Sequence, residues 1–336
     1  MKDKLLTALK VVISLGLIAY LLYRADLNVV IASIRSANYA YLVGGVLLYA
    51  GAVTAGGLKW YILLRAQGIL ISFGELLSYT FVGVFFNNFL PANVGGDVMR
   101  GYGLARYTER AAEAAVSVVV DRVVGLIAFM SAAFASSLAA VFIIGRHELL
   151  TIVIASGLAT LALACLFAAV LSRHIRAWVE RLFAVRLLAR FAPLYHRLSD
   201  ALTAYRFKFG RLFVAYCVSL MTLALSNFSI YVTAEALGGG VPLWAIFLFN
   251  PLIAFVLLIP ISVGGLGLNQ GAFVFFYGLV GIPGQVIFPV SLMMQFIIYL
   301  TSLPGGLLWL RSRRRGAAWP DAVAPSHVRA DDVRLR

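Results

Sequence analysis

Long, nearly uninterrupted apolar segments constrain this chain more than any other feature of its sequence. Six of them occur, at residues 5–23, 39–58, 123–144, 149–171, 212–236 and 285–310. A helix needs about 20 apolar residues to cross the hydrocarbon core of a bilayer, so each segment is long enough to span a membrane. Because 62% of the residues are apolar and only 12% are charged, a soluble domain would lack polar residues for its surface. We therefore predict an all-α polytopic membrane protein with about six full spans.

The first apolar segment is expected to remain in the protein as a membrane span. Lys2 and Lys4 precede it, and it ends in "YLLYRADLN", which has no small residues arranged as a cleavage site. A removable signal peptide would carry such a site. Residues 1–310 are thus expected to form a single transmembrane domain.

The positive charge of the chain is concentrated in two segments. The net charge is +14, and residues 172–211 hold nine Lys and Arg against two acids, while a second basic run starts at Arg311. Lys and Arg are enriched in the cytoplasmic loops of membrane proteins. We prefer this explanation to nucleic-acid binding, which basic runs can also indicate. It places both termini in the cytoplasm, the protein in the cytoplasmic (inner) membrane, and residues 311–336 in a basic tail that is expected to be disordered.

Two further apolar regions, residues 73–112 and 243–282, are interrupted near their middle by proline and glycine. Alternate counting of spans from the cytoplasmic loop puts both ends of 73–112 inside and both ends of 243–282 outside. The first region is predicted to be a re-entrant hairpin. The second is either a re-entrant hairpin or two short spans, which parity does not distinguish. Arg24 and Arg35 leave open an inverted first half in which 73–90 is a full span.

The two interruptions share a pattern. Residues 90–96 read "LPANVGG" and residues 259–265 read "IPISVGG". Proline removes a backbone donor, and paired glycines adopt angles closed to other residues, so both sequences end a helix. An exposed break is costly in lipid and is tolerated only against protein or a water-filled cavity. Matching breaks in two halves predict an inverted repeat with a site near the midplane, although Gly and Pro also occur as ordinary kinks in membrane helices.

Four charged residues lie beside the first break. Asp97 and Arg100 are three positions apart and share a helix face, and Asp121-Arg122 is expected at the mouth of the next span. A structural interpretation makes them ion pairs that anchor helix ends, with arginine snorkelling to the interface. In the functional interpretation, Arg100 and Arg122 present guanidinium groups to a phosphate while the aspartates hold them in place.

Amide side chains near the breaks are candidates for bonding a head group, and each is equally well explained as a helix-packing amide. These candidates are Asn87, Asn88, Asn250, Asn269 and Gln270. Lys59-Trp60 is interpreted as an interfacial pair at the end of the second span.

Signals of enzymatic or cofactor chemistry are missing. The sequence has no Walker loop and no nucleophile elbow, its four histidines are scattered, and Cys165 and Cys217 lie inside apolar segments. We expect no metal and no cofactor. Any transport would be passive or coupled to an ion gradient.

Three stretches resemble one known family. "NNFLPANVGGDVMRGYGLAR", "VSVVVDRVVGLIAF" and "IPISVGGLGLNQGAFVFFYGLVGIP" are similar to the lysylphosphatidylglycerol synthase transmembrane-region family, a flippase-like membrane domain, here in its stand-alone form without an aminoacyl-transfer domain. The resemblance implies translocation of lipids, including aminoacylated phospholipids. It supports roles for Pro91, Gly95, Gly96, Asp97, Arg100, Asp121, Arg122, Gly264, Gly265 and Gly267.

The second motif departs from the family pattern. Gln270 stands where a glutamate is usual, and Gln295 stands near where an arginine is often found, so both positions are neutral here and the resemblance does not imply charge coupling in the second half. The leading hypothesis is a lipid flippase whose partners are phospholipids, glycolipids or polyprenyl-phosphate lipids. The alternatives are a membrane enzyme of lipid-linked sugar metabolism, for which Asp97 is the candidate acid–base group, and a non-transporting scaffold that binds lipid-biosynthesis enzymes.

Overall fold

Five long apolar helices dominate the structure. The computed structural model describes residues 27–88, 95–172, 192–259, 262 and 264–314. Within them, the segments long and apolar enough to cross a membrane are Tyr39–Ala66, Ala111–Phe142, His147–Val170, Phe209–Ala236 and Gly284–Ser312. They confirm five of the six predicted spans. The predicted span 5–23, residues 173–191 of the basic loop and most of the tail lie outside the described residues.

All regular structure in the described part of the chain is helical. In chain order the elements are α2 (Leu27–Arg35), α3 (Tyr39–Ala66), α4 (Phe73–Asn87), α5 (Gly95–Thr108), α6 (Ala111–Phe142), η1 (His147–Leu149), α7 (Leu150–Val170), α9 (Ala192–Thr203), α10 (Phe209–Ala236), α11 (Leu243–Val256), α12 (Leu268–Gly278) and α13 (Gly284–Arg314). The predicted all-α class is therefore confirmed.

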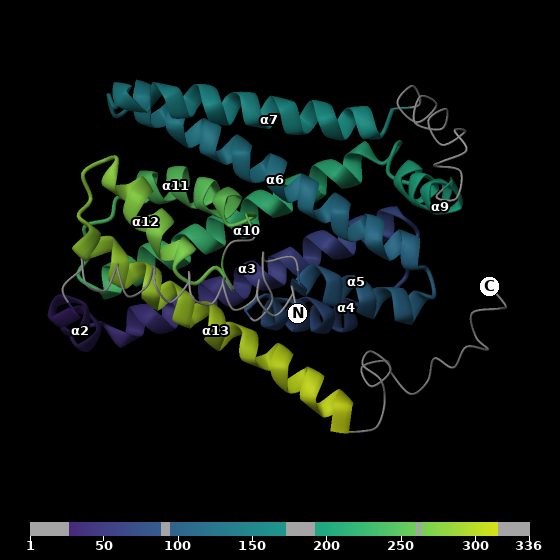
Figure 1. Ribbon diagram of the computed structural model, residues 1–336, viewed down its shortest axis with the longest axis horizontal. Coiled ribbons are helices and arrows are strands. Elements are labelled where there is room, and N and C mark those ends of the chain that lie inside the picture. Colours follow the sequence, from purple (N-terminus) through teal and green to yellow (C-terminus); the bar gives the residue numbers. More distant parts are fainter. Residues whose placement is uncertain (1–26, 89–94, 173–191, 260–261, 263, 315–336) are drawn as a thin grey trace, which may run out of the picture.

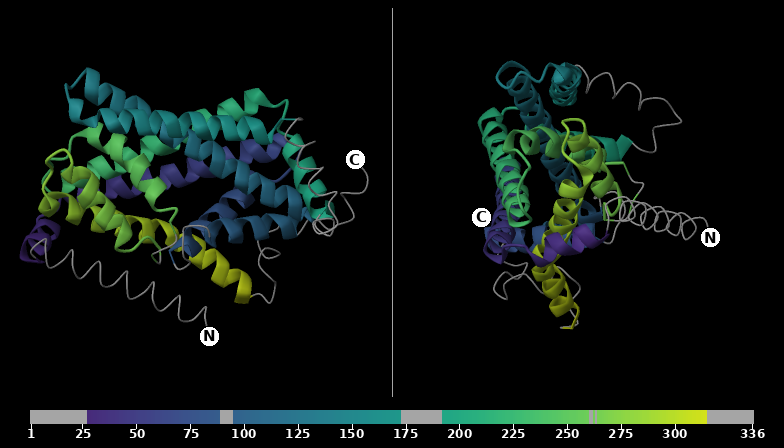
Figure 2. Two further views of the ribbon diagram at one scale, coloured as in Figure 1. Left: turned by 45° about the horizontal axis from the view of Figure 1, so that its top comes forward. Right: turned by 90° about the vertical axis from the view of Figure 1, so that its left-hand side faces the viewer.

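The two interrupted regions form helix pairs at opposite ends of the bundle. Figure 1 shows α3, α6, α7, α10 and α13 running along the molecule, with α4 and α5 toward one end and α11 and α12 toward the other. Figure 2 gives the same arrangement from two further sides. Residues 67–72 and 109–110 join the first pair to α3 and α6, and residues 237–242 and 279–283 join the second pair to α10 and α13. This placement agrees with the alternate counting of spans.

None of the four paired helices is long enough to cross a bilayer alone. They contain 15, 14, 14 and 11 residues. At about 1.5 Å per residue, the longest reaches about 22 Å, against about 30 Å of hydrocarbon. This length argues against 73–90 as a full span. Re-entry into a bilayer stays a prediction.

Local sequence signals explain where these helices begin. Ser72 and Glu75 form a reciprocal capping box at the start of α4, which satisfies two backbone donors that a helix start leaves open. At the second break, Gly264, Gly265 and Gly267 have φ of 57°, 76° and 79°, a region that favours glycine. The prolines of the two breaks, Pro91 and Pro260, lie outside the described residues.

The residues that flank the two breaks meet inside the bundle. A Cβ atom on Gly264 would lie 3.1 Å from the carbonyl carbon of Asn88, the residue that follows α4. The Asn88 side chain donates to the Ser302 hydroxyl at 2.8 Å, which links it to α13. The two interrupted regions therefore come together at these flanking residues.

Glycines let α13 and α5 pack closely on α4. A Cβ atom on Gly305 would overlap the backbone carbonyl of Phe81, and one on Gly306 would press into the Phe85 ring. On the side of α5, Gly83 and Gly96 face each other in the same manner. Small residues are the usual means by which membrane helices approach closely.

We predict that Gly305→Ala destabilises the fold by about 1–3 kcal/mol, because the added methyl overpacks a backbone contact. Gly56→Ala is the matched control, since nothing lies within 4 Å of a Cβ atom there. Alanine favours helix over glycine by up to about 1 kcal/mol, so the control should be neutral or stabilised. Unfolding in detergent by denaturant titration measures both variants, and equal stabilities would contradict the close packing of α13 on α4.

Candidate functional site

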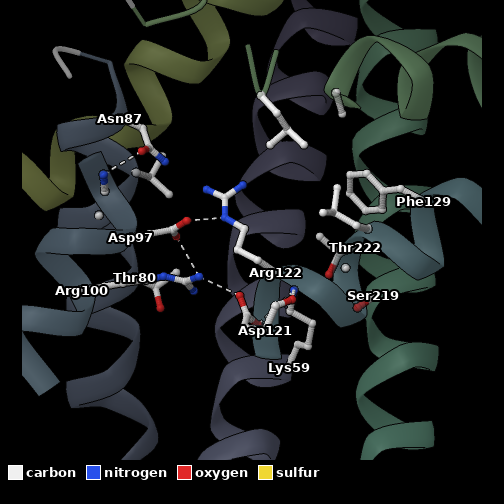
Figure 3. A pocket seen from close by; sticks show the side chains of 17 residues that line it. Lys59, Thr80, Asn87, Asp97, Arg100, Asp121, Arg122, Phe129, Ser219 and Thr222 are labelled. Atoms are coloured by element: carbon white, nitrogen blue, oxygen red, sulfur yellow. Dashed lines mark hydrogen bonds and ion pairs between the residues drawn. The ribbon is translucent and has the colours of Figure 1, made fainter. Parts of the chain in front are cut away.

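A cavity of about 240 Å³ lies against the first helix pair. Its walls come from α3, α4, α5, α6, α10 and the carboxyl end of α11, so both interrupted regions contribute to it. Figure 3 shows the lining side chains, with Arg122 near the centre of the view. The residues that line the cavity are Lys59, Thr80, Gly83, Val84, Asn87, Gly96, Asp97, Arg100, Asp121, Arg122, Gly125, Leu126, Phe129, Ser219, Thr222, Ala254 and Leu258.

Five charged side chains form an alternating chain along one wall of the cavity. The Lys59 ammonium lies 3.0 Å from the Asp121 carboxylate. The Arg100 guanidinium lies 2.7 Å from Asp121 and 2.8 Å from Asp97. Asp97 in turn pairs with Arg122 through its other oxygen. Figure 3 shows this chain from Lys59 to Arg122. We call these five side chains the ion-pair chain.

The ion-pair chain lies inside the bundle and not at its end. Asp121 is the eleventh residue of α6, which begins at Ala111, so it lies about 15 Å along that helix. Lys59 precedes the last residue of α3, Ala66, by seven positions, or about 10 Å. The expectation that Asp121 and Arg122 sit at the mouth of a span starting at residue 123 is therefore wrong. Because they pair with one another, these charged side chains can lie in the interior of the helix bundle.

Burial is uneven along the ion-pair chain. The side chains of Lys59, Asp121, Arg100 and Asp97 are 13%, 5%, 10% and 11% exposed, whereas that of Arg122 is 36% exposed. The chain contains three cations and two carboxylates, and its formal charge is therefore +1. The charged group most accessible from the cavity is a guanidinium, which suits contact with a phosphate or carboxylate.

Trp60 packs against the ion-pair chain without lining the cavity. Its ring lies 4.8 Å from the Arg100 guanidinium carbon, and its indole nitrogen donates to the Ser117 hydroxyl at 3.1 Å. Trp60 is fully buried, so the interpretation of Lys59-Trp60 as an interfacial pair is wrong. The reason is that α3 continues to Ala66 and places both residues inside the bundle.

Asn87 is the one predicted amide that lines the cavity. Its side-chain oxygen accepts from the Gly96 amide at 2.8 Å, next to the amino end of α5. This bond occupies one of the backbone donors that a helix start leaves open. A Cβ atom on Gly96 would overlap both the Gly83 carbonyl and the Asn87 side chain, so this contact requires glycine.

The other four candidate amides do not line this cavity. The Asn88 amide donates to Ser302, and the Asn250 amide donates to Asn227. The Gln270 oxygen accepts from the Gly267 amide at 2.7 Å and caps α12. Asn269 is buried in the same helix. These positions favour the structural explanation for the four residues.

The cavity also contains groups that sequence reasoning missed. Lys59, Ser219 and Thr222 line it, and the two hydroxyl residues come from α10. An ionisable residue inside an apolar helix is a signal for a functional site, and Lys59 could have been found on that basis. Serine and threonine are common in membrane helices, and nothing in their spacing singles out these two. In the described part of the chain, no three His, Cys, Asp or Glu side chains are placed to hold a metal ion.

Fold and site together define a multi-pass helical membrane protein with a charged cavity inside its bundle. The chain belongs to the family described as the lysylphosphatidylglycerol synthase TM region, whose model matches residues 7–305. It is 21% identical to a UPF0104 membrane protein of Pyrococcus horikoshii, over 91% of this chain and 97% of that protein. Two UPF0104 membrane proteins of Methanothermobacter thermautotrophicus are 23% and 25% identical, over 76% and 75% of this chain and 80% and 77% of those proteins. No solved structure matches the chain significantly.

We predict that Asp121→Asn destabilises the protein by about 3–5 kcal/mol, because it leaves buried Lys59 and Arg100 without their shared counter-ion. Glu148→Gln is the matched control, since Glu148 pairs with Arg146 at 3.0 Å on an exposed surface, and it should leave stability unchanged. The measurement is denaturant unfolding of each variant in detergent. Adding Lys59→Gln to Asp121→Asn should recover part of the loss, and an equal effect of Asp121→Asn and Glu148→Gln would contradict the buried network.

Proposed function

We propose that the protein is a lipid translocase that passes a polar or anionic lipid head group across the cytoplasmic membrane. The observation that carries this proposal is the two-sided character of the cavity. One wall holds the ion-pair chain, and the remaining lining includes Val84, Leu126, Phe129, Ala254 and Leu258. A lipid has the same division, because its head group needs charged or polar partners and its chains need apolar ones. In this proposal the head group passes through the cavity along the ion-pair chain, the adjoining ends of the acyl chains contact the apolar lining, and the rest of the chains stay in the bilayer.

The setting of the cavity supports transport as the role. Ionisable side chains inside a membrane bundle commonly mark a pathway for a substrate or ion. The family description concerns a membrane region linked to lysylphosphatidylglycerol, which supports a membrane lipid as the partner. Phospholipids, glycolipids and polyprenyl-phosphate lipids all belong to this class.

The arrangement of the two helix pairs supports an inverted repeat. The pairs carry the matching interruptions "LPANVGG" and "IPISVGG", lie toward opposite ends of the bundle in Figure 1, and meet at Asn88 and Gly264. Transporters built from such repeats place their site where the broken helices converge. We propose that both pairs are re-entrant and that they alternate in giving access to the cavity.

Charge asymmetry supports an orientation. The bundle end at which α4 begins and α5 ends carries Arg65, Arg106, Arg110, Arg211 and Arg311. At the opposite end, Arg35 ends α2, and Arg146 follows α6 and pairs with Glu148. Because Lys and Arg are retained on the cytoplasmic side, we place the end with α4 and α5 in the cytoplasm together with both termini.

The geometry argues for translocation over the enzymatic alternative. An enzyme of lipid-linked sugar metabolism would need Asp97 as an acid–base group. One oxygen of Asp97 pairs with Arg100 and the other with Arg122. A carboxylate held by two guanidinium groups is suited to positioning them.

We predict that Arg122→Gln slows lipid translocation at least tenfold, because it removes the cation most exposed to the cavity. Purified protein is reconstituted into liposomes containing phosphatidylglycerol with a fluorophore on one acyl chain, which leaves the head group intact. Dithionite, which quenches only the outer leaflet, reports the rate at which protected label becomes accessible.

Arg146→Gln is the matched control for this assay, since it makes the same chemical change in an exposed ion pair at the far end of the bundle. It should keep the wild-type rate. Protein-free liposomes set the background. Wild-type liposomes that lose no more label than this background would refute translocation of this lipid, and an unchanged rate for Arg122→Gln would refute the site.

A further inference from the structure

We infer that the cavity selects a lipid with a compact, net-negative phosphate head group and discriminates against a cationic aminoacyl head group. This inference rests on the proposed lipid translocation and specifies its substrate class. Three observations carry it, namely the order of charges along the ion-pair chain, the place where that chain ends, and the volume of the cavity.

The order of charges among the described residues favours an anionic ligand. From Lys59 to Arg122 the signs alternate, beginning and ending with a cation. Each carboxylate is already shared between two cations. The formal charge of the five groups is therefore +1, and an anion next to a terminal cation would both continue the alternation and neutralise the site.

The two ends of the ion-pair chain differ in their surroundings. Lys59 donates to the backbone carbonyl of Asp121 at 3.0 Å as well as pairing with its carboxylate, and its side chain is 13% exposed. Gly125 lies beside it, where a Cβ atom would come within 3.2 Å of the Lys59 nitrogen. Arg122 has 36% of its side chain exposed, and in Figure 3 it extends between the Asp97–Arg100 wall and Phe129. The anion is therefore expected at Arg122.

In the low dielectric of a membrane bundle, the net positive charge of the site is expected to favour a negatively charged head group over a positively charged one. An uncompensated charge is costly where water is scarce, and a partner of opposite sign offsets the cost. An anionic head group brings the total charge of site and ligand to zero, whereas a cationic one raises it to +2. A guanidinium also matches phosphate with two parallel hydrogen bonds. We therefore expect phosphatidylglycerol to be preferred at least tenfold over lysyl-phosphatidylglycerol, whose lysyl group adds two amines and makes the head group cationic.

The volume of the cavity limits the size of the head group. At about 240 Å³, it lies below the range of about 300–1,000 Å³ typical of pockets for drug-sized ligands. A phosphate with a small alcohol suits such a space. The apolar side chains of Phe129, Ala254 and Leu258 in the lining favour a phosphate attached to acyl chains over a free phosphate ion.

Ligand-dependent stabilisation of the full chain in detergent tests the inference without relying on transport, because a ligand that binds the native state raises its unfolding temperature. The probes are dihexanoyl forms of phosphatidylglycerol, phosphatidylcholine and lysyl-phosphatidylglycerol, and inorganic phosphate. The apparent Kd should be at least tenfold lower for phosphatidylglycerol than for the other three. Comparable Kd values for the three lipids would overturn the charge selectivity. A Kd for inorganic phosphate as low as that for phosphatidylglycerol would overturn the assignment to a lipid.

Two variants separate charge from hydrogen-bond geometry. Arg122→Gln lowers the formal charge of the site to zero and should reduce the preference to within about twofold. Arg122→Lys keeps the charge and should keep the order of preference with weaker binding. Arg146→Gln should behave as the wild type. A full preference retained by Arg122→Gln would overturn the inference, and the comparison of lipids on the wild type stands even if that variant fails to fold.

The liposome assay is repeated with acyl-labelled forms of phosphatidylglycerol, phosphatidylcholine and lysyl-phosphatidylglycerol. This comparison distinguishes failure of the inference from failure of the proposed function. Selective binding of phosphatidylglycerol without movement of any lipid would refute translocation and uphold the selectivity. Movement of all three lipids at equal rates with equal affinities would uphold translocation and refute the selectivity. Faster movement of phosphatidylglycerol, together with its tighter binding, is the expected result.

Discussion

Alternating charges held in a low-dielectric interior are the interaction on which the rest of this structure depends. Lys59, Asp121, Arg100, Asp97 and Arg122 come from α3, α5 and α6, and none of them could be buried there alone. Their pairing therefore fixes the relative position of two spans and of the first helix pair. The same requirement explains why Trp60 packs against the Arg100 guanidinium, since an aromatic face is one of the few apolar surfaces that attract a cation.

The backbone breaks follow from the same physics. A helix that ends inside a bundle leaves donors and acceptors that lipid cannot satisfy, so each end must find a partner in the protein. Asn87 accepts from the Gly96 amide, and Gln270 accepts from the Gly267 amide. Glycine contacts then allow α5 and α13 to approach α4 closely enough to exclude lipid. Asn87 and Gln270 thus act first as replacements for missing helical hydrogen bonds, and of these two only Asn87 also reaches the cavity.

Much of this arrangement could be predicted from sequence, and the failures share a cause. Five spans and both helix pairs follow from apolar length and from the positions of Pro and Gly, and the Asp97–Arg100 pair follows from helical spacing. The start of α6 could not be predicted, because charged residues are expected outside a membrane span, whereas pairing with α3 and α5 brings Asp121 and Arg122 inside. The same expectation places Lys59 at an interface. The spacing of residues in the sequence identifies which side chains share a face of one helix. Whether a charged side chain can be buried depends on the oppositely charged side chains that face it from another helix.

The contact between Asn88 and Gly264 has a consequence for how such a molecule could move. Asn88 adjoins the tip of one helix pair and Gly264 the tip of the other, and Asn88 is also bonded to Ser302 on α13. Neither residue can advance toward the other without displacing it. In the proposed translocase, a steric interlock of this kind would keep the two entrances from standing open together, so that a passage for lipid need not become a leak for ions.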